Sequence, residues 1–207
     1  MTSEEKKEYI ERIIGRLKSI DYIKPSDIPN IDLYMDQVTT FMDEHLMSLK
    51  RHEEDKMLTK TMINNYTKNN LLPSPNKKKY SKDHMLLLIF IYYFKNILPI
   101  SDIQEIIHPL VERYYDGSEE LSLEDIYLEV FSMEKDLIAA LTKDILKKYQ
   151  VSKGTFEQEE NPEKRKFLTD FSFICTLCFD VYVKKTIIEN LLDGQLLRKT
   201  EGKDGEE

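Results

Sequence analysis

The chain has 207 residues, of which 41% are hydrophobic and 33% are charged, and its formal net charge is −8. This balance predicts a folded globular protein, with one large domain or two small ones, and argues against a disordered chain. Only six glycines are present and β-branched alternation is scarce, so glycine-rich phosphate loops are disfavoured and an all-α fold is expected. The sequence contains no nucleophile-elbow, zincin or dinucleotide-binding pattern, which indicates neither an enzyme nor a bound cofactor.

Residues 1–26 are expected to form an N-terminal amphipathic helix followed by a connector. Apolar residues recur at helical spacing between Tyr9 and Ile20, and the acidic residues after Ser3 suit the positive end of a helix dipole. The segment lacks the cationic and apolar regions of a signal peptide. Since the chain has only two cysteines, we expect a cytoplasmic protein.

A second helix is predicted from Asp32 to Leu49, in a position to support the short helix that follows it. His45 and His52 lie near its end without other metal-binding residues beside them. A metal ion needs at least three convergent ligands, so no metal site is expected. The core candidates of this helix are Leu33, Val38, Phe41, Met42, Leu46 and Leu49.

A short helix from Thr59 to Asn69 is the element on which the functional interpretation depends. On an ideal helix Ile63 and Tyr66 share the inner side, and the opposite side carries two amides, a hydroxyl and an ammonium group. Amides can pair with adenine, and lysine can contact guanine or phosphate, although a solvated face without any partner would show the same pattern. The exposed set is Thr61, Asn64, Asn65 and Lys68, with Tyr66 as a supporting residue.

The loop after this helix carries three consecutive lysines, Lys77, Lys78 and Lys79. Asn70 is expected to end the helix in a left-handed conformation, and the prolines that follow prevent its continuation. Residues 48–82 hold nine cations against three carboxylates, a net charge of +6 that leaves −14 on the remainder. A basic patch on an acidic body can bind a polyanion if the acidic parts face away.

The most apolar run is Met85–Phe94, which Ser81 precedes as a helix cap. Its ten residues cover about half of the roughly 20 that a membrane span needs, so we expect the central helix of a fold and no membrane association. The residues Ser101 to Gln104 are typical of a capping box for the next helix. Pro109 is expected to end or kink that helix near Ile107.

The best domain boundary is residues 116–120, and two long helices are predicted after it. The first runs from Ser122 to Gln150 and the second from Pro162 to Leu192. The second helix carries apolar residues at alternating four- and three-residue steps, with Lys185 in the one polar position, which is typical of a coiled coil between two chains. A central bundle helix would fit equally well, because other faces are also apolar. The seam residues are Phe167, Phe171, Ile174, Cys178, Val181, Ile188 and Leu192.

Cys175 and Cys178 form a C-x-x-C pair within this last helix. No second cysteine pair accompanies them, and no strand–helix junction of the thioredoxin type is predicted. We therefore expect both to be small core residues without a redox or metal-binding role.

The segments Ile63–Pro73 and Tyr80–Asp83 resemble the recognition helix and wing of MerR-type regulators. The turn Leu98–Ile103 is similar to the turn that follows the next helix, after the wing, in the same family. The stretch from about 27 to 107 resembles more closely still an uncharacterised domain-of-unknown-function family that is regarded as MerR-like. These resemblances imply a winged helix-turn-helix that binds double-stranded DNA, although Asn64 stands where MerR proteins have an arginine.

The sequence thus predicts four parts, with a helical packing or dimerisation module after the DNA-binding half. We expect a homodimeric transcriptional regulator, with the small-molecule effector and the operator undefined. The alternative is a helical protein-interaction module that retains the fold without binding DNA. The predicted parts are residues 1–26 (N-terminal helix and connector), 27–116 (helix-turn-helix domain), 117–197 (C-terminal helical module) and 198–207 (disordered tail).

Overall fold

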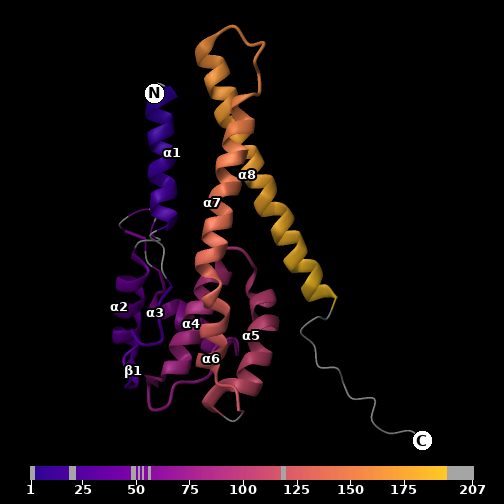
Figure 1. The fold of residues 1–207 in the computed structure, drawn as a ribbon. Helices are drawn as coiled ribbons and strands as arrows, with labels where there is room; N and C mark the ends of the chain where they lie inside the picture. The colour runs from indigo at the N-terminus through magenta and orange to yellow at the C-terminus, as the bar shows by residue number, and fades with distance from the viewer. Residues whose placement is uncertain are drawn as a thin grey trace, which may run out of the picture. The chain divides into compact units, whose positions relative to one another are not determined.

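The structure is a computed structural model, and it describes residues 3–18, 22–47, 50, 52, 54–55, 57–117 and 120–194 (Figure 1). The described chain is mostly helical and contains one two-stranded sheet. In chain order the elements are α1 (Ser3–Lys18), β1 (Leu33–Tyr34), α2 (Met35–His45), α3 (Lys60–Lys68), β2 (Lys79–Tyr80), α4 (Lys82–Lys95), α5 (Ile100–Tyr114), the 3₁₀ turn η2 (Tyr115–Gly117), α6 (Leu123–Ser132), α7 (Glu134–Lys153) and α8 (Pro162–Asp193).

The chain divides into two compact units. The first unit is Met1–Tyr22 with Glu129–Lys184, and the second unit is Ile23–Leu128 with Lys185–Glu207. The N-terminal helix α1 therefore groups with α7, which it contacts. The main segment of the second unit ends at Leu128.

Helix α4 is the centre of the second unit. Every residue from His84 to Tyr92 is buried, and Leu87 and Ile91 are both fully inaccessible. Ser81 forms the N-cap of α4, as predicted, in a capping box with His84. The apolar run is thus the core helix that the sequence indicates, and α5 packs against it.

The second helix begins later than predicted because its first residues belong to a strand. Leu33 pairs with Tyr80 and Tyr34 with Lys79 in the antiparallel β1–β2 sheet. Helix α2 therefore starts at Met35 and ends at His45, and the expected bounds Asp32–Leu49 are wrong. The core candidates from Leu33 to Leu46 are all buried, and Leu49 lies outside the described residues.

Helix α5 differs from its prediction at its start, and it does not end at Pro109. It starts at Ile100 after Pro99, so Ser101 is not a cap, and the Gln104 side chain donates to the carbonyl of Asn69 at 2.9 Å instead of closing a capping box. The helix also continues past Pro109 to Tyr114. Proline deprives the carbonyl four residues earlier of its partner. That carbonyl belongs to Glu105, which is exposed, so water can take the place of the lost donor.

The predicted helix from Ser122 to Gln150 is two helices. Helix α6 ends at Ser132, whose hydroxyl donates to the Glu129 carbonyl at 2.7 Å, and α7 starts after Met133. A serine that bonds back to its own helix competes with the regular backbone pattern, which accounts for the break. The structure confirms α8, which starts at Pro162 with Asn161 accepting hydrogen bonds from the next backbone amides.

Within the first unit, α7 and α8 form an antiparallel pair (Figure 1). Lys148 of α7 bridges to Asp180 of α8 at 2.8 Å, and the rings of Tyr149 and Phe173 lie edge to face at 5.3 Å. Tyr22 stacks on Phe131 at 5.4 Å. Among the described helices, none is long and apolar enough to cross a membrane.

Candidate nucleic-acid interface

Helix α3 is held by its caps and by two buried side chains. The Thr59 hydroxyl accepts a hydrogen bond from the Met62 amide at 3.2 Å. At the other end Asn70 has φ 55°, the left-handed conformation predicted for it, which asparagine tolerates better than most residues. Ile63 and Tyr66 are buried, so the rotation of α3 about its own axis is fixed.

This rotation leaves the predicted polar face in solvent. Thr61, Asn64, Asn65 and Lys68 are all exposed. Tyr66 is only 4% exposed, and burial raises the pKa of its hydroxyl. Tyr66 therefore packs beneath α3 and offers almost no surface to a ligand, so any part that it has in the interface is to support the helix.

The lysine loop is a tight turn that closes on β2. The Lys79 amide donates to the Asn76 carbonyl at 2.9 Å, and Lys77 and Lys78 have φ values of 48° and 66°. Positive φ at both central residues defines a type I′ turn, in which asparagine and glycine are the usual residues. A left-handed conformation costs an L-residue with a side chain roughly 1–2 kcal/mol, so two lysines here are an exception to local preference.

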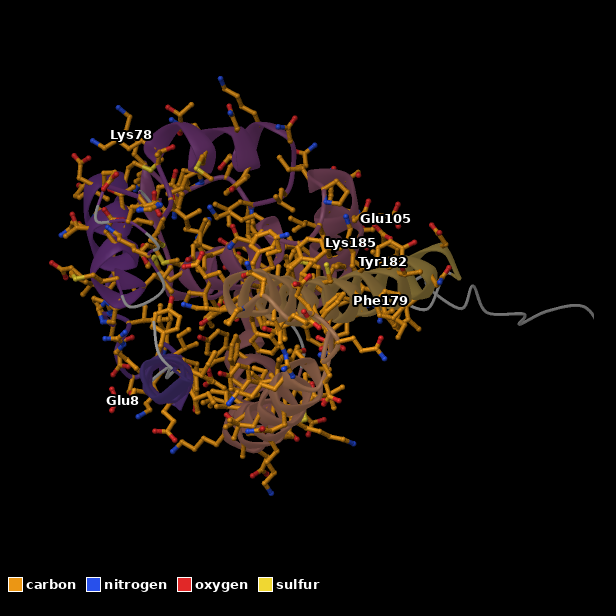
Figure 2. All side chains as sticks on the ribbon, turned by 90° about the horizontal axis from the view of Figure 1, so that it is seen from above. Glu8, Lys78, Glu105, Phe179, Tyr182 and Lys185 are labelled. Atoms are coloured by element: carbon orange, nitrogen blue, oxygen red, sulfur yellow. The ribbon has the colours of Figure 1, made fainter. Side chains whose placement is uncertain are left out.

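The sheet holds this turn in place. Lys79 pairs with Tyr34 in the β1–β2 ladder, and its ammonium group lies over the Tyr34 ring at 5.2 Å. Lys77 and Lys78 are exposed, and Lys78 lies at the outer edge of the second unit (Figure 2). The turn therefore presents two ammonium groups outward and keeps the third against an aromatic ring.

Ion pairs remove several other cations from the basic segment. Lys50 pairs with Asp43 at 3.6 Å, Lys82 pairs with Glu124 at 2.8 Å, and Lys60 pairs with Asp36. The other described lysines of the segment have no described carboxylate oxygen within 4.0 Å of their ammonium nitrogens, the distance that defines an ion pair. These are Lys68, Lys77, Lys78 and Lys79.

His84 connects the turn to the core, a role that sequence reasoning missed. Its Nδ1 accepts a hydrogen bond from the Ser81 amide at 3.0 Å and lies 2.9 Å from the Ser81 hydroxyl. The Tyr115 hydroxyl is 3.1 Å from the ring, and the rings of Tyr80 and Tyr115 approach it edge-on. The only available signal was the spacing of three between Ser81 and His84, because histidine is not the usual partner in a capping box.

Burial sets the protonation of this cluster. It lowers the pKa of His84, and hydrogen bonding to the backbone of Pro73 and Ser74 partly opposes that shift. It also raises the pKa of Tyr115 to about 12. Because Nδ1 accepts the Ser81 amide, the neutral ring with its proton on the other nitrogen is the form that fits this site.

Carboxylates lie on the other side of Ser81. Asp83 accepts a hydrogen bond from the Asp116 amide at 3.1 Å, and burial raises its pKa. Asp83 and Asp116 line a hollow of about 250 Å³ together with Asp32. In the part of the chain that the structure describes, no group of three or more histidine, cysteine or acidic residues could hold a metal ion.

The second unit is thus a small helical domain with a minimal strand pair, an exposed polar helix face and a cationic turn. Residues 23–130 match the family described as Domain of unknown function (DUF1836), and the chain belongs to this family. The match begins at the same residue as the second unit and ends two residues beyond its main segment. No curated protein and no solved structure matches the chain.

Proposed function

We propose that the second unit binds double-stranded DNA as a transcriptional regulator of the winged helix-turn-helix type. Helix α3 would enter the major groove, with α2 behind it and the β1–β2 pair with its turn as a minimal wing. Thr61, Asn64 and Asn65 would face base edges, and Lys68 a base or an adjacent phosphate. Lys77, Lys78 and Lys79 would bind the flanking phosphates.

The distribution of paired and unpaired lysines carries this proposal. Of the seven described cations between residues 48 and 82, three have carboxylate partners, and these lie outside the predicted interface. The four without a described carboxylate partner are the lysines of the α3 face and of the turn. A solvated surface without a ligand gives no reason for this division.

The geometry of the turn supports the same function. Backbone strain in exposed residues is retained where a constraint other than folding selects it. Glycine at positions 77 and 78 would relieve the strain but would remove two ammonium groups. Lysine at both positions is the choice expected if charge at the tip of the turn matters more than local stability.

The experiment is fluorescence anisotropy of the full chain with duplex DNA at several salt concentrations. A bound complex whose affinity falls steeply with salt supports the proposal, since each neutralised phosphate releases condensed counterions. Selection of bound duplexes from a random pool then tests base recognition by α3. Binding without sequence enrichment would limit the role to phosphate contact.

A protein-interaction module without DNA binding is the second candidate, and the net charge of −8 favours it. It predicts no duplex binding even at about 50 mM salt, where phosphate contacts are strongest. The same titration therefore decides between the two functions.

A further inference from the structure

One face of α8 is apolar and uncovered. Phe167, Phe171, Ile174 and Val181 are 53–68% exposed, and Cys178 between them is exposed as well. These are five of the seven seam positions that the alternating four- and three-residue spacing predicts; of the other two, Ile188 is half-buried and Leu192 is 8% exposed. Within the first unit, α7 contacts a different face of α8, through Phe173 and Asp180.

The cysteines follow the same arrangement. Cys175 and Cys178 are both exposed, so their prediction as core residues is wrong within a single chain. The error has a simple origin: their helix face is apolar in composition, but no described element of the first unit covers it. A helix face with the apolar spacing of a core, but exposed to solvent, indicates that another molecule covers it.

The uncovered area is large enough for a stable interface. Tyr182 extends the apolar face at 65% exposure (Figure 2). With roughly 120 Å² left accessible on each of five large side chains, the face offers on the order of 600 Å² per copy. Two such faces would bury about 1,200 Å², the lower limit of specific protein–protein interfaces, and each face is at the upper end of the about 300–600 Å² patches that monomers expose.

We propose that a second copy of this chain covers this face, with the two α8 helices antiparallel about a two-fold axis near Thr176. In heptad terms Phe167, Ile174 and Val181 are d positions, and Phe171 and Cys178 are a positions. Antiparallel a–d′ layers then place Phe171 level with Val181 of the second copy, and Ile174 level with Cys178. Each layer pairs a larger side chain with a smaller one, as dense packing requires.

Charge favours the antiparallel direction. A parallel pair would place Lys185, the next a position, against Lys185 of the second copy in the seam, where like charges repel. The antiparallel pair places Lys185 level with Phe167 at the end of the seam, so that its stem can cover the ring and its ammonium group can reach water. Asp170 and Lys184 are both g positions, which flank the seam. In the antiparallel pair Asp170 of each copy lies near the level of Lys184 of the other copy, so two pairs of opposite charge form by symmetry.

The remaining segment of the chain does not suit this face. Residues 195–207, QLLRKTEGKDGEE, contain two leucines and otherwise polar residues, too few apolar side chains to match five. This proposal does not depend on DNA binding, and each can fail without the other.

The test is cross-linking of the full chain in a Cys175→Ser, Cys178→Ser background. Phe171→Cys and Val181→Cys are prepared separately and treated with the shortest bismaleimide, alone and as an equimolar mixture. In the antiparallel dimer the introduced thiols of two identical variants lie ten residues apart along the axis, about 15 Å. The thiols of the two different variants instead share a layer. We expect a covalent dimer from the mixture and at most a trace from either variant alone.

The control replaces Val181→Cys with Val183→Cys, which points away from the seam and should not cross-link to Phe171→Cys. Equal cross-linking of each variant alone would show a parallel pair and overturn the proposed direction. If the chain is a dimer but the mixture of the two variants cross-links no faster than either variant alone, the proposed pairing of positions 171 and 181 in one layer is wrong. Sedimentation equilibrium of the unmodified chain completes the test, because a monomer at about 100 μM, where a standard-size interface should hold, would overturn the proposal entirely.

Discussion

Neutralising the turn lysines should change the salt dependence of DNA binding by a predictable amount. The variant is Lys77→Gln, Lys78→Gln, Lys79→Gln, which keeps a polar side chain at each position and removes three charges. Each phosphate contact contributes about −0.9 to the slope of log K against log salt on B-form DNA. With Lys68 as a fourth contact, the unmodified chain should have a slope near −3.6 and the variant a slope near −0.9.

The slopes translate into affinities that an anisotropy titration resolves easily. Between about 50 and 200 mM salt, four contacts should cost the unmodified chain about 150-fold in affinity. The variant, with one contact, should lose only about 3- to 4-fold over the same range. The difference reflects the turn itself, because Lys77, Lys78 and Lys79 have no carboxylate partner within the described residues.

A matched control separates local contact from overall charge. Lys143, Lys147 and Lys164 are exposed lysines of the first unit, and their replacement by glutamine changes the net charge equally. These lysines are not among the proposed phosphate contacts, and the slope reflects the number of contacts, so this control should retain the full slope. A control that lowers the slope as much as the turn variant would refute the assignment of the turn as a phosphate clamp.

Three further outcomes follow from the second unit. Replacement Lys78→Gly should raise the free energy of unfolding, measured in urea, by about 1 kcal/mol, because glycine adopts φ 66° without strain. The same replacement should flatten the salt slope of DNA binding by about 0.9. A less stable protein would contradict the strain argument. Replacement Leu87→Ala should lower the free energy of unfolding by about 2–5 kcal/mol in the same assay, since the side chain is fully buried in α4. A loss below about 1 kcal/mol would contradict the placement of α4 at the centre of the core. Because burial lowers the pKa of His84, the unfolded chain binds a proton at this residue more readily than the folded chain does. The stability that the neutral His84 ring contributes is therefore complete above about pH 6.5 and is lost as the pH falls below that value. The drop in stability between about pH 7.5 and 5.5 should therefore shrink in His84→Gln and persist in the exposed His108→Gln; equal drops in both would exclude His84 as the source.

Local patterns predicted the elements around α3 well. The spacing of Ile63 and Tyr66 fixed which side of the helix is buried, and the same arithmetic placed Asn64 and Lys68 in solvent. Asn70 and the prolines after it predicted where α3 ends. These features depend on residues within a few positions of each other, for which helical periodicity and backbone preferences are sufficient.

Long-range pairings lay outside the reach of the same reasoning. Leu33 and Tyr34 have the composition of a helix start, but they pair with a strand 46 positions later. His84 looks unpartnered in sequence because Tyr115, 31 residues away, supplies its neighbour. The carboxylates that neutralise Lys60 and Lys82 belong to other helices, so the charge of residues 48–82 overstated the number of available cations.

Composition alone could not show whether an apolar helix face is covered. The residues of α8 from Phe167 to Val181 have a core pattern, and Cys175 and Cys178 were assigned to a core on that basis. Their exposure depends on which helices of the same chain reach them, and α7 reaches another face. A pattern of this kind states that a surface must be buried, but not whether the same molecule buries it.

Ser81 belongs to two features at once: it follows β2 directly, and it forms the N-cap of α4. The lysine turn is therefore joined to the most buried helix of the protein without any flexible spacer. Folding itself immobilises the turn, so a polyanion that binds there would not bear the entropy loss of ordering a loose loop. One residue inserted between Tyr80 and Ser81 should lengthen this connection, leave α4 intact, and weaken binding through the freedom that it returns to the lysines.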